Sequence, residues 1–317
     1  MLIELTSPLM NDNLAPDFID RIMSAFGRMN SAFTSDHWLF VILALVPVLA
    51  WIYLFLQHQP ENKVRVAITF GAGMFAVIPI FVFQHEIGRI GDWLTSIGGG
   101  AVLTIVFAAL WVGLYEETAK HWIVKKVDKG FFRSIDDAIQ FSIIGALGFA
   151  FLENVLYFYS IWNNPLIENF WFYYGFRSIG SMFLHIFASG IFGYYYGVAH
   201  FAQPVLQEKI RTGKRFPLIG WLHRVLHLRS ETLFHEEKIL EGLVLAAVLH
   251  GTFDFLMGMS QHATDEGSAL AQIWLALAVP FLVGGFFWLT YLLDKKEDHK
   301  QYGHVTDERT SNVKIGS

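Results

Sequence analysis

The 317-residue sequence contains no cysteine, which excludes disulfide frameworks, thiolate metal sites and cysteine nucleophiles. Charge is also scarce, because Asp, Glu, Lys and Arg make up 16% of the residues, whereas a typical soluble domain has about 25%. The net charge of −5 argues against a nucleic-acid partner held on a basic surface. Hydrophobic residues make up 54% and include 30 Phe and 10 Trp, too many for one water-soluble globule to bury. The composition therefore predicts a polytopic membrane protein in contact with the lipid bilayer.

Seven apolar stretches are long enough to cross a membrane. A hydrocarbon core of about 30 Å requires roughly 20 apolar residues of helix. We predict spans at about 37–57, 66–85, 97–122, 138–160, 173–199, 239–259 and 270–293. The predicted fold class is all-α, a membrane helix bundle of about seven transmembrane helices.

The basic residues predict the orientation of these spans. Nineteen of the 23 Lys and Arg residues fall in four segments, namely 58–65, 116–134, 200–238 and 294–317. These segments alternate along the chain with the remaining segments outside the spans, which carry few basic residues. Cytoplasmic loops carry the excess of Lys and Arg in membrane proteins. We therefore expect a multi-pass protein of the cell membrane with its N-terminus outside and its C-terminus in the cytoplasm.

The regions outside the spans differ in character. Residues 1–36 form the expected external N-terminal segment, which lacks the pattern of a secretory signal peptide. Within it, residues 18–29 fit either an interfacial amphipathic helix or a disordered leader. The membrane domain, 37–293, contains a basic cytoplasmic insertion at 200–238. In that insertion His223 and His227 have a spacing that can hold a metal, although a solvated face lying against anionic lipid is the simpler explanation. The charged cytoplasmic tail at 294–317 is expected to be disordered.

Ionisable residues inside the spans are the strongest functional signal. A charged side chain at the centre of a span costs about 2.5–3.5 kcal/mol on insertion scales, so such residues usually face a protein interior and have a function. Glu116, Glu117 and Lys120 lie in the cytoplasmic half of the third span. Glu116 and Lys120 have the favourable order and spacing for an intrahelical ion pair. A charge cluster that merely ends the helix is the alternative.

The next three spans carry further ionisable residues at membrane depth. Glu153 is set among Phe, Leu and Val with no basic residue in its own span, and a protonated glutamic acid is the alternative to a functional role. His185 lies near the middle of the fifth span, where a packing role explains it equally well. His250 and Asp254 share one helical face in the sixth span. A carboxylate beside a histidine can fix its tautomer or share its metal.

The summed charge favours a metal ion. When ionised, Glu116, Glu117, Glu153 and Asp254 contribute −4, and Lys120 returns +1. A net charge of −3 in a low dielectric requires protonation of some acids or entry of a cation. Carboxylate and imidazole without thiolate are the ligands of a catalytic zinc site. Since the H-E-x-x-H signature is absent, residues from several helices must hold the ion, in an active site buried between them.

Four short motifs on consecutive spans resemble those of the PrsW family of intramembrane proteases. They are Glu116-Glu117-x-x-Lys120, Phe149-x-x-x-Glu153, His185 and His250-x-x-x-Asp254, and the likeness covers roughly residues 97–260. The wider group includes the CAAX prenyl endopeptidases, whose pattern has His in place of Glu153 and usually Asn in place of Asp254. The sequence is therefore more similar to PrsW than to that relative.

The resemblance implies a membrane-embedded metalloendopeptidase that cleaves membrane-associated proteins, for example a single-pass regulator such as an anti-sigma factor. It implies that Glu116 or Glu117 activates the attacking water and that Lys120 neutralises this pair or stabilises the oxyanion. The expected cofactor is Zn²⁺, and the implied metal ligands are Glu153, His185 and His250, with Asp254 ligating the metal or orienting His250. A purely glutamate-driven reaction without metal stays open.

Two other classes of function remain open from the sequence. Buried carboxylates and histidines also form proton relays, so an ion-coupled or proton-coupled carrier is one alternative. Many carriers contain inverted repeats, and we find no internal repeat. A non-catalytic scaffold of the same fold is the other alternative, against which the intact glutamate pair argues.

Overall fold

The computed structural model describes residues 27, 38–56, 63–128, 131–163, 169–202 and 230–301, and these residues form helices and no strands. The elements are α2 (Trp38–Leu56), α3 (Lys63–Phe75), α4 (Val77–Ser96), α5 (Ala101–Asp128), α6 (Ile135–Trp162), α7 (Phe170–Phe176), the π-helical turn η2 (Arg177–Ser181), α8 (Met182–Phe201), α11 (Ser230–Asp265) and α12 (Leu270–Gln301). The predicted all-α polytopic bundle is confirmed.

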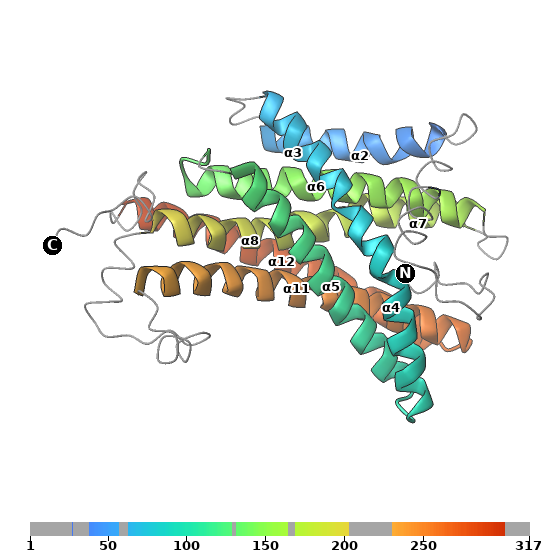
Figure 1. Cartoon of the computed structure of the whole chain (residues 1–317). Helices are drawn as coiled ribbons and strands as arrows, with labels where there is room; N and C mark the ends of the chain where they lie inside the picture. Colours follow the sequence, from blue (N-terminus) through green and yellow to red (C-terminus); the bar gives the residue numbers. More distant parts are fainter. Residues whose placement is uncertain are drawn as a thin grey trace.

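Each predicted span has a helical counterpart. Six helical stretches are long and apolar enough to cross a membrane: Lys63–Ile80, Ala101–Val127, Ile135–Trp162, Phe170–Phe201, Thr232–Asp265 and Leu270–Lys296. The seventh counterpart is a shorter apolar helix, Trp38–Leu54 within α2. The chain passes back and forth through the bundle, so that successive passes are antiparallel (Figure 1).

Several helices extend beyond the predicted spans. α4 continues to Ser96, past the predicted end at 85, and α12 continues to Gln301, past the predicted end at 293. Hydropathy detects only the apolar part of a helix, whereas Lys, Glu and Gln are also good helix formers. α4 ends where Gly98 adopts a positive φ of 87°, the left-handed conformation that commonly terminates helices.

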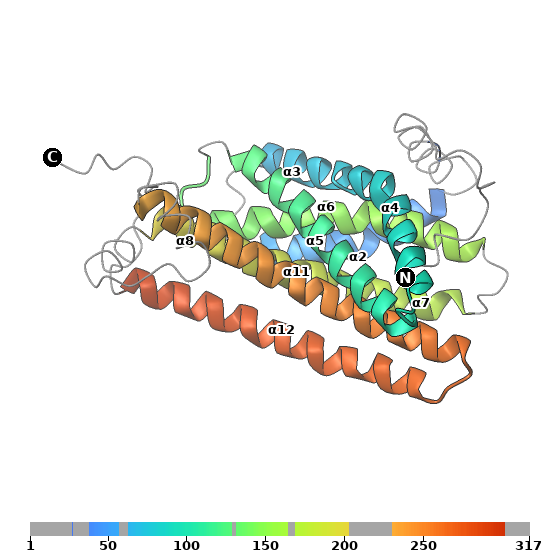
Figure 2. The ribbon, with the colours of Figure 1, turned by 60° about the horizontal axis from the view of Figure 1, so that its bottom comes forward.

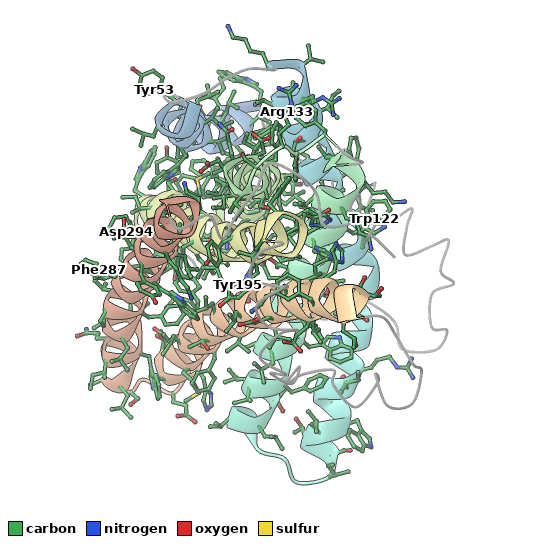
Figure 3. The ribbon with its side chains drawn as sticks, turned by 90° about the vertical axis from the view of Figure 1, so that its left-hand side faces the viewer. Tyr53, Trp122, Arg133, Tyr195, Phe287 and Asp294 are labelled. Atoms are coloured by element: carbon green, nitrogen blue, oxygen red, sulfur yellow. The ribbon has the colours of Figure 1, made fainter. Side chains whose placement is uncertain are left out.

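α6 lies at the centre of the bundle, and α12 lies at its edge (Figures 1 and 2). In the most apolar window of α6, 94% of the residues are buried, against 17% in α12. Viewed from one end of the bundle, the labelled side chains Tyr53 and Phe287 point outward from α2 and α12 (Figure 3). An apolar helix that exposes its side chains in this way suits contact with lipid. The polar residues that matter for function are therefore those packed around α6.

One end of the bundle collects many of the described basic residues, and we call it the basic end. It contains the start of α3 with Lys63 and Arg65, the end of α5 with Lys125 and Lys126, and the end of α12 with Lys296. This is the end on the left in Figure 1. The grouping agrees with the alternation of basic segments in the sequence, and the assignment of this end to the cytoplasm stays a prediction.

Some predictions concern residues outside the described part of the chain. They include the possible interfacial helix at 18–29, of which residue 27 alone is described, the histidine pair His223 and His227, and the tail from residue 302 onward.

Candidate active site

The acidic pair of α5 points into the protein interior. Glu116 and Glu117 are 1% and 2% exposed, and Lys120, one turn further along, is 4% exposed. The ammonium nitrogen of Lys120 lies 2.9 Å from Oε1 of Glu117 and 3.4 Å from Oε2 of Glu116. Because α5 continues to Asp128, this cluster does not mark the end of the helix. The predicted pair of Glu116 with Lys120 is present, and Glu117 makes the shorter contact.

α11 brings an imidazole against both glutamates. Nδ1 of His250 lies 2.8 Å from Oε1 of Glu117, and its Nε2 lies 3.3 Å from Oε2 of Glu116. Asp254, one turn further along α11, is more exposed, and its Oδ2 lies 3.7 Å from the same Nε2. The two residues thus share one face, as their spacing predicts.

Two glycines allow α5 and α11 to approach so closely. A Cβ atom on Gly113, one turn before the glutamate pair, would lie 2.7 Å from the backbone oxygen of Ala247 and 2.7 Å from the backbone nitrogen of Gly251. Real side chains essentially never make such short contacts. Gly251 directly follows His250 in the sequence, so this crossing point determines how deeply the imidazole reaches toward α5.

α8 contributes His185, which uses both ring nitrogens. Its Nδ1 lies 2.8 Å from the ammonium of Lys120, and its Nε2 lies 3.0 Å from Oε2 of Glu153 on α6. An ammonium group only donates hydrogen bonds, so Nδ1 accepts and Nε2–H donates to the carboxylate. The contacts therefore select the neutral tautomer with its proton on Nε2. Phe149, from the same motif as Glu153, packs its ring 4.3 Å from the Lys120 nitrogen.

Glu153 has a cationic partner that the sequence analysis missed. Arg177, 1% exposed, places Nη2 3.0 Å from Oε1 of Glu153 and donates from Nε to Oδ1 of Asn154 at 2.8 Å. The absence of a basic residue from the helix of Glu153 is real, but the neighbouring helical segment supplies one. Arg177 is one of only four basic residues outside the basic segments of the sequence, and this was the signal that could have found it.

The position of Arg177 coincides with a change in helix geometry. Residues Arg177–Ser181 form a π-helical turn between α7 and α8. Single π turns are rare within α-helices and occur frequently at functional sites. This turn lies two helical turns before His185, so Arg177 and His185 reach the same carboxylate of Glu153 from one continuous helical pass.

Arg177 adds a positive charge that the sum of charges predicted from the sequence did not include. Four ionised acids with Lys120 and Arg177 give −4 + 2 = −2, not −3. One divalent cation would neutralise this charge, and protonation of two groups would do the same. The charge sum therefore does not by itself select between a bound cation and protonation, and His250, whose two ring nitrogens both face carboxylate oxygens, is a natural carrier of such a proton.

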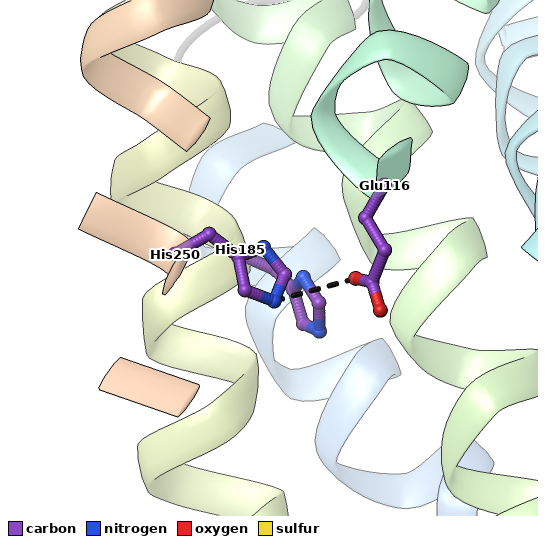
Figure 4. A group of neighbouring side chains, drawn as sticks. All are labelled: Glu116, His185 and His250. Atoms are coloured by element: carbon purple, nitrogen blue, oxygen red, sulfur yellow. Dashed lines mark ion pairs between the residues drawn. The ribbon is translucent and has the colours of Figure 1, made fainter. Parts of the chain in front are cut away.

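Three side chains fit a metal ion by position and by chemistry. Glu116, His185 and His250 each offer one ligand atom, and these atoms all lie within 4.8 Å of one another. They come from α5, α8 and α11, and they approach one another in the interior (Figure 4). Two imidazoles and one carboxylate are the donor set of many catalytic zinc sites. Glu153 and Asp254, which the resemblance also implied as ligands, lie outside this group of three.

The chain is similar to proteins of one known family. A sequence model of the family described as PrsW family intramembrane metalloprotease matches residues 61–285. Protease PrsW from Bacillus subtilis (strain 168) is 26% identical over 245 residues, which cover 77% of this chain and 86% of that protein. No solved structure matches. The family match contains all four motifs and extends beyond the region 97–260 that the motifs themselves suggested.

Proposed function

The chain belongs to the PrsW family of intramembrane metalloproteases, and from this we propose that it hydrolyses peptide bonds of membrane proteins by means of a glutamate-activated water. The observation that carries the proposal is the buried contact network of Glu116, Glu117, Lys120, His185 and His250. Buried ionisable residues within membrane spans are costly, so a network of them is expected to have a function.

We assign the metal to Glu116, His185 and His250, whose ligand atoms lie close together. Zinc bound there would supply Lewis acidity toward the scissile carbonyl and toward water. The neutral tautomer of His185 suits this role, because Nδ1 keeps its lone pair while Nε2–H is held by Glu153.

We propose Glu117 as the general base. Its carboxylate is outside the metal group, is buried, and contacts both Lys120 and His250. It would take a proton from water as the water oxygen bonds to the carbonyl carbon, and give that proton to the amine nitrogen as the C–N bond breaks. Lys120, which has no acceptor atoms, would orient Glu117 and stabilise negative charge on the carbonyl oxygen.

Glu153 and Asp254 act in this proposal as positioning residues. Glu153 accepts from His185 and is itself held by Arg177, which keeps the imidazole in one orientation. Asp254 lies beside His250 at 3.7 Å and would orient it in the same way. Carboxylates that contact metal-bound histidines in this manner affect metal affinity and activity by about 10–100-fold.

We propose a single-pass membrane protein as the substrate. The site lies between transmembrane helices, so the scissile bond must enter or lie next to the bilayer. Placing the basic end in the cytoplasm follows the general charge rule for loops. Anti-sigma factors with one span are the first substrates to test, and the orientation is to be checked with a reporter fused after residue 300.

Substitution of Glu117 by Gln tests the proposed function. This change keeps the size of the side chain but removes its ability to accept a proton, so cleavage should fall by at least about 10²-fold. Cleavage of a single-pass reporter in membranes gives the readout. Glu241→Gln is the matched control and should retain activity, because Glu241 lies on α11 outside the network, in a partly exposed pair with Lys238. Full cleavage by the Glu117→Gln variant would exclude the proposed mechanism.

A further inference from the structure

A second pair of histidines joins the same two helices far from the candidate active site. His200 lies in the last turn of α8, and His235 lies near the start of α11. Each is 15 residues from the active-site histidine of its own helix, a distance of about 22 Å along the helix axis. The pair lies toward the basic end of the bundle and takes no part in the network described above.

The two imidazoles face each other through their Nε2 atoms. These atoms are 3.0 Å apart, with the rings 4.4 Å apart at 74°. Nδ1 of His200 lies 2.9 Å from the backbone oxygen of Tyr196, and Nδ1 of His235 lies 3.5 Å from Oε1 of Glu236. Both Nδ1 atoms therefore face oxygen acceptors.

Proton accounting shows that either a proton or a metal ion can join the two rings. Tyr196 offers a carbonyl oxygen, which only accepts, so the proton of neutral His200 belongs on Nδ1 and leaves a lone pair on Nε2. Nδ1 of His235 faces the Glu236 carboxylate at an ion-pair distance of 3.5 Å, and a proton on this nitrogen leaves a lone pair on Nε2 of neutral His235 as well. Two Nε2 lone pairs then point at each other across 3.0 Å. They repel unless a proton or a metal ion lies between them.

We propose that His200 and His235 form a second metal site, which binds a divalent transition ion such as Zn²⁺, Ni²⁺ or Cu²⁺. Histidines that ligate metals usually donate their other N–H to a carbonyl or a carboxylate, and both partners are in place here. Two nitrogens bound at 2.0–2.1 Å to a tetrahedral ion lie about 3.3–3.4 Å apart, which requires the rings to separate by only a few tenths of an ångström. Imidazole ligands suit all three ions.

Water is the further ligand available here, because no group of three ligating side chains among the described residues includes His200 and His235. The side chain of His235 is 26% exposed, so water can reach the ion. A third imidazole, His121 of α5, packs against Tyr196, whose ring also contacts His200. Nδ1 of His121 is buried and has no hydrogen-bond partner among the described residues. An ion bound here would link α8 to α11, the two helices that carry His185 and His250.

Metal content of the purified full-length protein tests this site. We expect His200→Asn/His235→Gln to lose about one zinc per chain relative to the wild type after equilibration with excess Zn²⁺ and desalting. His262→Gln is the matched control, because His262 lies on the same helix at the opposite end and is similarly exposed. Equal zinc content in the wild type and the double variant would overturn the inference. If the candidate active site held no metal, the wild type would bind one zinc per chain and the double variant would bind none. Failure of the metal assignment at the active site can therefore be distinguished from failure of this second site.

A second measurement guards against misfolding of the double variant. His235→Gln alone changes a partly exposed side chain, and its Tm in EDTA should match that of the wild type. Zn²⁺ should raise the Tm of the wild type and of His262→Gln, and raise the Tm of His235→Gln less, because an ion that binds only the folded state stabilises it. An identical zinc-dependent shift in all three proteins would show that the pair shares a proton only, which contradicts the proposal.

Discussion

The ammonium nitrogen of Lys120 lies 2.8 Å from Nδ1 of His185, although the two residues are 65 positions apart in the sequence. The same nitrogen lies 3.4 Å from Glu116. Lys120 therefore contacts two of the three side chains that form the candidate metal group. A lysine cation and a metal ion attract the same carboxylate and the same imidazole, so the occupancy of this site depends on where the lysine lies.

Substitution of Lys120 by Met should separate metal binding from catalysis. Removing a positive charge within 4 Å of the ligands favours a divalent ion, and we expect metal affinity to rise by about tenfold. Cleavage should nevertheless fall by about 10²-fold, because the proposed general base loses its partner and the carbonyl oxygen loses a donor. Competition with a chelator measures the affinity, and a reporter assay measures cleavage. Weaker metal binding in this variant would contradict the assignment of Lys120 as a competing cation.

Removal of the metal should abolish activity in a reversible way. A chelator that strips Zn²⁺ should stop cleavage by the wild type, and added Zn²⁺ should restore it, because the proposed reaction needs a Lewis acid. His250→Ala should remain inactive after the same addition, since it lacks one ligand. Undiminished cleavage by protein that contains no metal would favour the purely glutamate-driven alternative.

Arg177 should be more important for stability than for chemistry. Arg177→Met removes one partner of the Glu153 carboxylate, which is 18% exposed. Breaking a fully buried ion pair from one side costs about 3–5 kcal/mol, which is the upper bound for this pair. The double variant Arg177→Met/Glu153→Met removes both charges and should recover much of the lost Tm while staying impaired in cleavage, because His185 loses its acceptor. Thermal unfolding in detergent measures the first effect. A double variant no more stable than Arg177→Met would argue against direct pairing.

The crossing of α5 and α11 should tolerate no side chain at Gly113. A Cβ atom there would lie 2.7 Å from backbone atoms of α11, so Gly113→Ala must push the helices apart. Displacements of about 1 Å at a catalytic site can cost about 10²-fold in rate, and we expect a loss of kcat/KM of that order. Gly71→Ala on α3 is the matched control, because nothing lies within 4 Å of its added Cβ. Wild-type activity in Gly113→Ala would show that this close approach is not needed.

Local properties of the chain were enough to establish the membrane bundle and most of the candidate site. Hydropathy located the six candidate spans and the shorter apolar helix of the described residues, since apolar content over about 20 residues is a local quantity. The i, i+4 spacing of His250 and Asp254 correctly placed them on one helical face, because helical periodicity depends only on sequence separation. The four motifs also pointed to the family, since they follow one another in order along the chain.

The sequence by itself thus determined which ionisable residues lie within the apolar helices, and the tertiary structure decided which of them touch. Glu117 and His250 are 133 positions apart, and their contact depends on how closely Gly113 lets α5 approach α11. The partner of Glu153 comes from a π-helical turn on the next pass, which no hydropathy pattern reveals. The histidine pair of α8 and α11 is likewise a product of helix rotation and crossing. Such contacts depend on the relative rotation and separation of whole helices, and these quantities are set by packing across the entire bundle.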